Sequence, residues 1–262
     1  MSDQKYKPDY SLLLTPSQVF EIQKRQNQDD YIYTITSKER SISVYGLQHT
    51  FNLKDLKGFQ ERLAGSDLVY IEGIYSFSVI DSISVETSDI KVIEQYGEQT
   101  YIGWFAKKLN IEVKCWDLSI SDLVKEALNE FSRVSFLGWL AGNGFKMLKS
   151  ESKELDASEW ARQVVKTTGI SVTGTEINNA VRHYFGKDFK DLTFDEAEEL
   201  ASPSSSLDTG RIASSMVLKR DKHFLDIVAK DLNESVGSRN IFVSAGLSHA
   251  ITWKRALEKM LI

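Results

Sequence analysis

The chain has 262 residues, of which 42% are hydrophobic and 26% are charged, and it carries a net charge of −5. This length and composition fit a globular protein with a sizeable core, either one large domain or a domain with an insertion. The negative charge argues against a nucleic-acid partner or an anionic membrane surface, and a single cysteine, Cys115, excludes an internal disulfide.

The first ten residues are polar and lack the apolar segment of a signal peptide. No segment reaches the roughly 20 apolar residues that a membrane span needs. We therefore expect a cytoplasmic protein without a membrane span. The most apolar stretch, residues 134–148, is interrupted by Gly138, Asn143 and Lys146 and predicts a core or lid helix.

The first part of the chain predicts a helix followed by two strands. Thr15 and Gln18 form a capping box around Pro16, which begins a helix that runs to about Asn27. Residues 31–35 and 41–45 are rich in β-branched and aromatic side chains and predict strands.

Alternating strands and helices then predict a parallel sheet. Residues 53–63 have helical spacing, and the apolar run 67–71, which ends on Glu72, predicts a buried parallel strand. A helix over 97–110 and a strand over 111–116 continue the alternation. This order favours an α/β fold with a mainly parallel or mixed central sheet flanked by helices.

From Ser119 the pattern becomes helical. Helices are predicted at 121–131, 157–166, 175–185 and 194–200, then a serine-rich loop at 202–206, one long helix or two over 212–233, a strand at 240–245 and a final amphipathic helix to Ile262.

The element order predicts a core encoded in two pieces. We expect an N-terminal helical extension (1–30), the first part of the α/β core (31–118), a helical insertion or lid (119–210) and the second part of the core (211–262).

Two segments share one pattern, in which an apolar strand is followed by Gly46-Leu-Gln-His49 in one case and by Gly246-Leu-Ser-His249 in the other. The glycine allows a tight turn from strand to helix, and the histidine lies at the start of that helix. Because open α/β sheets bind ligands at the carboxyl ends of their strands, we expect both histidines there.

Charged residues complete the predicted site. Glu72 ends an apolar strand, where a carboxylate is costly without a partner or a role. Glu98 begins a helix, where the helix dipole also favours a carboxylate. Asp117 belongs to the same rim or caps the next helix. Arg220, beside Asp221 on the long helix, either holds a substrate carboxylate or oxyanion, or lies on a solvated face.

These motifs resemble a superfamily that contains the TraB and Tiki proteins, the erythromycin esterases and the ChaN-like haem-associated proteins. Its members carry two GxxH motifs, one early and one late, with glutamates between them. The resemblance rests on Gly46–His49, the strand that ends at Glu72, Gly97-Glu98 with the unit that follows, Arg220-Asp221 and Gly246–His249. It covers about half the chain, and the TraB and Tiki side fits best.

The resemblance implies a hydrolase of amide or ester bonds acting on a small-molecule or peptide substrate. His49 and His249 would be metal ligands or acid–base groups, Glu72 and Glu98 the ligand and the general base, and Arg220 would position the substrate or stabilise developing charge.

Three hypotheses follow. In the first, His49, Glu72 and His249 bind Zn, Mn or Co, which activates water. In the second, a metal-free esterase uses His49 or His249 as the base. In the third, the same residues hold a small ligand or haem without turnover.

Overall fold

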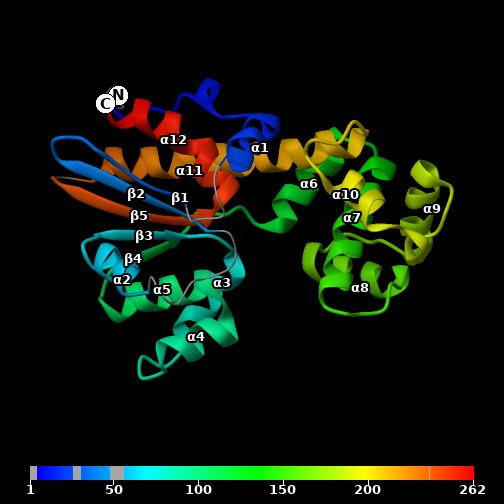
Figure 1. Cartoon of the computed structure of the whole chain (residues 1–262), viewed down its shortest axis with the longest axis horizontal. Coiled ribbons are helices and arrows are strands. Elements are labelled where there is room, and N and C mark those ends of the chain that lie inside the picture. The colour runs from blue at the N-terminus through cyan, green and yellow to red at the C-terminus, as the bar shows by residue number, and fades with distance from the viewer. Residues whose placement is uncertain (1–4, 26–30, 48–55, 236) are drawn as a thin grey trace. The chain divides into compact units, whose positions relative to one another are not determined.

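The structure is a computed structural model that describes residues 5–25, 31–47, 56–235 and 237–262 (Figure 1). The chain divides into two compact units, one formed by Met1–Asp117 with Arg220–Ile262 and the other by Leu118–Lys219. The predicted helical insertion, 119–210, lies inside the second unit.

The first unit contains a mixed five-stranded sheet in the order β1-β2-β5-β3-β4. The strands are β1 (Tyr31–Thr36), β2 (Arg40–Leu47), β3 (Leu68–Ile71), β4 (Glu112–Cys115) and β5 (Arg239–Gly246). β1 pairs with β2 in antiparallel fashion, and the other three pairs are parallel. The prediction of an α/β fold with a mainly parallel or mixed sheet is confirmed.

Alternate residues of the strands supply two different cores. In β5, Ile241 and Val243 face one core while Phe242 faces the other. β3 is buried over its whole length, as expected of a strand covered on both faces. The long apolar run that ends at Glu72 is therefore an interior strand of the sheet.

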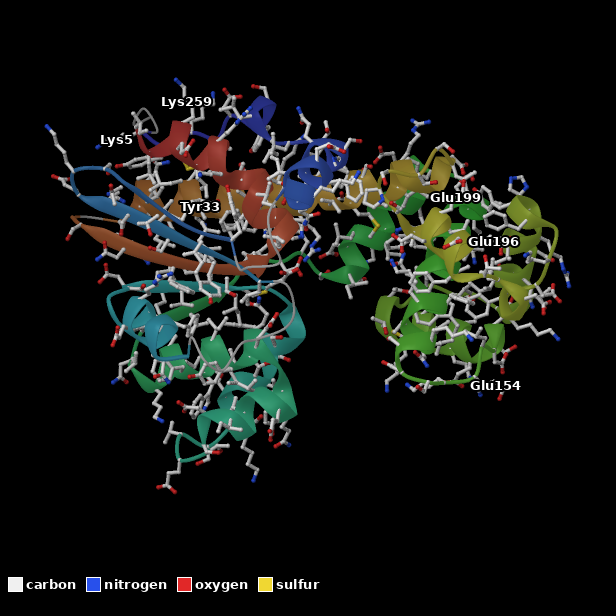
Figure 2. All side chains as sticks on the ribbon, viewed as in Figure 1. Lys5, Tyr33, Glu154, Glu196, Glu199 and Lys259 are labelled. Atoms are coloured by element: carbon white, nitrogen blue, oxygen red, sulfur yellow. The ribbon has the colours of Figure 1, made fainter. Side chains whose placement is uncertain are left out.

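Helices cover both faces of this sheet. Figure 1 shows α12 (Leu247–Leu261) and, from Arg220 onward, α11 (Asp208–Glu234) on one side, and α2 (Leu56–Ala64) and α5 (Glu98–Lys108) on the other. Tyr33 of β1 points into the layer under α12, where its hydroxyl donates to the Ala250 carbonyl at 2.9 Å (Figure 2). Among the described residues, the remaining helical segments of this unit are η1 (Tyr10–Leu12), α1 (Pro16–Arg25), α3 (Ile74–Val79), η3 (Ile80–Ser82) and α4 (Asp89–Tyr96).

The helices α3 and α4 were not predicted. The sequence of α3, Ile-Tyr-Ser-Phe-Ser-Val, is rich in residues that prefer strands, and α3 is only six residues long. Such short helices form because tertiary packing holds them, so local propensity carries little information about them.

The second unit is entirely helical over its described length. It comprises α6 (Ile120–Glu130), α7 (Arg133–Ser150), α8 (Ala157–Thr168), α9 (Gly174–Phe185), η4 (Phe189–Asp191), α10 (Phe194–Ala201) and the first part of α11. The apolar stretch at 134–148 lies in α7 and is a core helix. Gly144 lets Trp160 approach, since a Cβ at Gly144 would lie 2.3 Å from the indole. No helix in the described ranges is both long and apolar enough to cross a membrane.

Candidate functional site

The two strands that precede the Gly-Leu-x-His segments are neighbours in the sheet. β2 and β5 pair in parallel, with Gly46 opposite Ala245 and Leu47 opposite Gly246. Both segments therefore leave the sheet at the same edge. His249 is in the first turn of α12, whereas His49 lies outside the described residues.

The glycines of these segments serve packing and hydrogen bonding. Gly246 has a φ of −58° and a ψ of 146°, which any residue can adopt, so its turn requires no glycine conformation. At Gly46 a Cβ would lie 2.6 Å from the Cβ of Ala250. Gly46 therefore allows α12 to approach β2 closely, a role that was not predicted, and the turn expected after it lies outside the described residues.

Two carboxylates converge on Arg220 at the carboxyl ends of β3 and β4. The Arg220 Nε donates to Asp117 at 2.7 Å, and its Nη2 donates to Asp117 at 2.9 Å and to Glu72 at 2.8 Å. The second oxygen of Glu72 accepts from the Gly246 N–H at 2.6 Å. Glu72 therefore ties α11, which carries Arg220, to the end of β5.

This network fixes the charge of Glu72. Burial raises the pKa of Glu72, but the electrostatic influence of His249 and Arg220 and the hydrogen bond from the Gly246 N–H together outweigh burial and hold that pKa below its ordinary value. Burial likewise opposes the charge of Arg220, yet hydrogen bonding to Asp117 and the charges of both carboxylates raise its pKa. Both groups are therefore ionised at neutral pH.

His249 forms a second network with Asp221 and Trp253. Its Nδ1 lies 2.7 Å from Asp221 Oδ1, and the Trp253 Nε1 donates to the same oxygen at 2.6 Å. Because an indole can only donate, Asp221 is the acceptor here, and we assign the proton of His249 to Nδ1. The side chains of His249 and Asp221 are only 6% and 2% exposed.

Aromatic rings join the two networks. The Trp116 ring centroid lies 5.2 Å from that of His249, and the Arg220 guanidinium carbon lies 5.2 Å from the Trp116 centroid. Trp253 stacks on His249 with centroids 5.5 Å apart. Because Arg220 and Asp221 are consecutive on α11, one helix turn supplies both networks with a charged partner.

Glu98 begins α5, directly after Gly97, whose φ of 82° favours glycine. The next residue, Gln99, accepts a hydrogen bond from the Glu72 N–H at 3.1 Å. The helix that carries Glu98 thus reaches the site through Gln99, and the role of Glu98 as general base stays a prediction.

Of the residues predicted from sequence, the structure places Glu72, Arg220 and His249 around one edge of the sheet. Sequence reasoning left Asp117 with alternative roles and did not identify Asp221, Gln99 or Trp253 as parts of the site. One signal was available for Trp253, because it follows His249 by four residues and so shares its helix face.

The His, Cys, Asp and Glu side chains that the structure describes at this edge make a poor cation site. No three His, Cys, Asp or Glu side chains among the described residues are grouped as metal ligands. His249 offers one nitrogen, and Glu72 is a carboxylate that already pairs with Arg220. Burial raises the pKa of the nearby Cys115 to about 11, so it is a thiol at neutral pH.

Comparison with known proteins finds no family model that matches the chain and no curated protein that matches its sequence. The resemblance to the TraB and Tiki proteins therefore stays a prediction, and the function is argued from the geometry of the site.

Proposed function

We propose that this protein is a hydrolase of amide or ester bonds in which His249 takes the proton of the attacking water. The observation that supports this is the 2.7 Å contact between His249 Nδ1 and Asp221 Oδ1, anchored by Trp253. A carboxylate on one ring nitrogen fixes the tautomer and the orientation of an imidazole and leaves the other nitrogen with a lone pair.

The proposed step needs one base and one carbonyl group. His249 Nε2 accepts a proton from water while the water oxygen bonds to the carbonyl carbon of the substrate. The imidazolium then donates that proton to the departing amine or alcohol as its bond to carbon breaks. Asp221 stabilises the imidazolium, and it does so strongly because the pair is buried beside indole rings.

Glu72 and Arg220 support this step indirectly. Because the pKa of Glu72 is lowered, Glu72 carries a negative charge near His249 that favours the imidazolium. Arg220 contacts both Glu72 and Asp117 and therefore positions these carboxylates. We propose that Arg220 serves the site by pairing with Glu72 and Asp117, and that it does not itself bind the substrate.

The divalent metal that the resemblance implies does not fit the described donors. A cation beside His249 and Glu72 would be repelled by the Arg220 guanidinium, which is 2.8 Å from Glu72. We therefore favour the metal-free form of the hydrolase, and no step of the proposal uses a metal. The predicted ligand His49 lies outside the described residues.

The test is a hydrolysis assay on nitrophenyl esters and amino-acid nitroanilides with purified full-length chain. His249→Ala and Asp221→Asn should each lower kcat by about 100-fold or more, since a positioned base contributes roughly 10²–10⁴. His183→Ala, which changes an exposed histidine, serves as the matched control and should stay within about twofold of the wild type.

Removal of metal ions by a chelator distinguishes the metal-free hydrolase from the metal-dependent one. Incubation with EDTA followed by gel filtration should leave the rate unchanged, and loss of activity that Zn or Mn restores would show that the metal-dependent form is correct. Hydrolysis that is equal in the wild type and in His249→Ala would contradict the proposal in both forms.

A further inference from the structure

The helical second unit contains a pocket that takes no part in the proposed reaction. The pocket has a volume of about 390 Å³, and the residues that line it all belong to this unit. Sites that hold small molecules have volumes of roughly 300–1,000 Å³, so this pocket lies at the lower end of that range. Its size therefore suits a small ligand.

The end of α6 and one face of α11 supply the side chains that define the pocket. Glu130 is the last residue of α6, and Phe131 follows it. Arg211, Ser215 and Leu218 come from α11, where their spacing of four and three residues places them on the same helix face. The pocket thus combines charged, hydroxyl and apolar side chains.

The loop before α11 closes another side of the pocket and is held to the helix. The Ser214 hydroxyl donates to the Pro203 carbonyl at 2.9 Å, and both residues line the pocket. Gly210 lets the loop approach, since a Cβ at Gly210 would lie 2.6 Å from the Ser205 carbonyl oxygen. These contacts fix the wall of the pocket before any ligand binds.

Glu130 and Arg211 place opposite charges on this wall. Lys219 and Ser215 donate to Glu130 Oε2 at 3.1 and 3.2 Å, and Oε1 accepts no hydrogen bond from a described residue. The hydrogen bond from Lys219 and the nearby Arg211 charge lower the pKa of Glu130, which is therefore ionised at neutral pH. The exposed Arg211 side chain forms no hydrogen bond or ion pair within the part of the chain that the structure describes.

We propose that this pocket binds a zwitterion with an apolar side chain, which is the chemistry of a free amino acid or a short peptide. The Arg211 guanidinium binds the carboxylate of the ligand, and Glu130 Oε1 accepts from its ammonium group. A ligand with only one of these charges is repelled by the wall group of the same sign.

Two side chains supply the apolar part of this site. Phe131 packs against the core of the unit and is only partly buried, and Leu218 is 40% exposed. Contact with the ligand removes this apolar surface from water, which favours a ligand with an aliphatic side chain.

The first test measures binding to the full-length chain, with L-leucine and the dipeptide Leu-Leu as probes. The methyl resonances of ¹³C-labelled protein are followed during each titration, with Leu218 assigned through Leu218→Met. The Leu218 methyl groups should shift in a saturable way. Leu148, which is fully buried in the core of the same unit, is the internal control and should not shift. The probe that binds more tightly identifies a free amino acid or a peptide as the ligand.

The second test removes one charge of that probe at a time. Its N-acetyl derivative lacks the ammonium group and its C-terminal amide lacks the carboxylate. Each derivative should bind about fivefold or more weakly than the zwitterion, because each loses one charge-assisted contact.

Variants then assign each charge to its residue. Arg211→Gln should weaken the zwitterion but not the amide derivative, and Glu130→Gln should weaken the zwitterion but not the N-acetyl derivative. Arg162→Gln is the matched control, because Arg162 is 74% exposed on α8 and should leave every affinity unchanged.

Three results would overturn the inference. The first is an unmoved Leu218 signal with both probes up to their solubility. The second is equal affinity for the zwitterion and either derivative. The third is a loss of affinity in Arg211→Gln that is as large for the amide derivative as for the zwitterion.

Discussion

Glu72 shows how one buried carboxylate connects three elements of the site. Its two oxygens accept from Arg220 of α11 and from the Gly246 N–H of β5, and its own N–H donates to Gln99 of α5. A carboxylate that is only 17% exposed tolerates this position because positive and polar partners surround it. Its ionisation is therefore coupled to the stability of the unit.

The pKa of Glu72 in the folded protein is lowered relative to the unfolded chain, so its contribution to stability is present above the ordinary value of 4.5 and is lost as the pH falls through the folded value. We expect the free energy of unfolding, measured with urea at several pH values below 5, to fall less steeply in Glu72→Gln than in the wild type.

Glu86→Gln, which removes an exposed carboxylate, is the control. In this variant the free energy of unfolding should fall with pH as steeply as in the wild type. Equal slopes in the wild type and in Glu72→Gln would show that this carboxylate titrates alike in both states and would contradict the electrostatic account of the site.

At the scale of elements, the position of His249 depends on how closely α12 packs against β2. The contact occurs where Gly46 faces Ala250, and the Tyr31 carbonyl lies 3.2 Å from the site of a Cβ at Gly46. No side chain fits there without movement of the helix or the strand. The position of the helix that carries His249 therefore depends on a glycine in a neighbouring strand.

Gly46→Ala should destabilise the protein by roughly 1–3 kcal/mol, as expected for an overpacked core site. The measurement is urea unfolding followed by circular dichroism. Gly58→Ala is the matched control, because no atom lies within 4 Å of that Cβ site on α2, and it should be neutral or stabilising by about 0.5–1 kcal/mol.

The double variant Gly46→Ala with Ala250→Gly removes the clash and should be less destabilised than the sum of the two single changes, which reveals their coupling. Strict additivity of the two would mean that Gly46 is required for some other reason than the contact with Ala250.

At the scale of the whole molecule, the chain has separate hydrophobic cores. As far as the structure describes the chain, one consists of residues from the second unit, including Phe145 and Phe189, and the two cores around the sheet consist of residues from the first. Separate cores of this kind define regions that open with different free energies.

Phe145→Ala should lower the stability of the second unit by roughly 3–5 kcal/mol, since it deletes a large buried side chain. Hydrogen exchange read by mass spectrometry should then show faster exchange over Leu118–Lys219 and unchanged protection of β5. Equal loss of protection in β5 would show that the chain unfolds as one cooperative unit.

The sequence by itself determined the class of fold and most of its elements. Period-two and helical patterns, capping residues and apolar runs are local signals, so they located β3, β5 and the long helix α11. The repeated Gly-x-x-His pattern likewise identified His249, and the end of an apolar run identified Glu72. The short helices α3 and α4 were not predicted because their local sequence patterns are weak indicators of a helix.

Only the tertiary structure decided which side chains meet. That Asp221 faces His249, that Arg220 is held by two carboxylates and that Gln99 reaches the Glu72 backbone are facts about elements far apart in the chain. Nothing in the local sequence encodes them, because they depend on strand order and on how α11, α12 and α5 pack on the sheet. The periodicity of a segment fixes its own form, whereas a site exists only once distant segments share the same space.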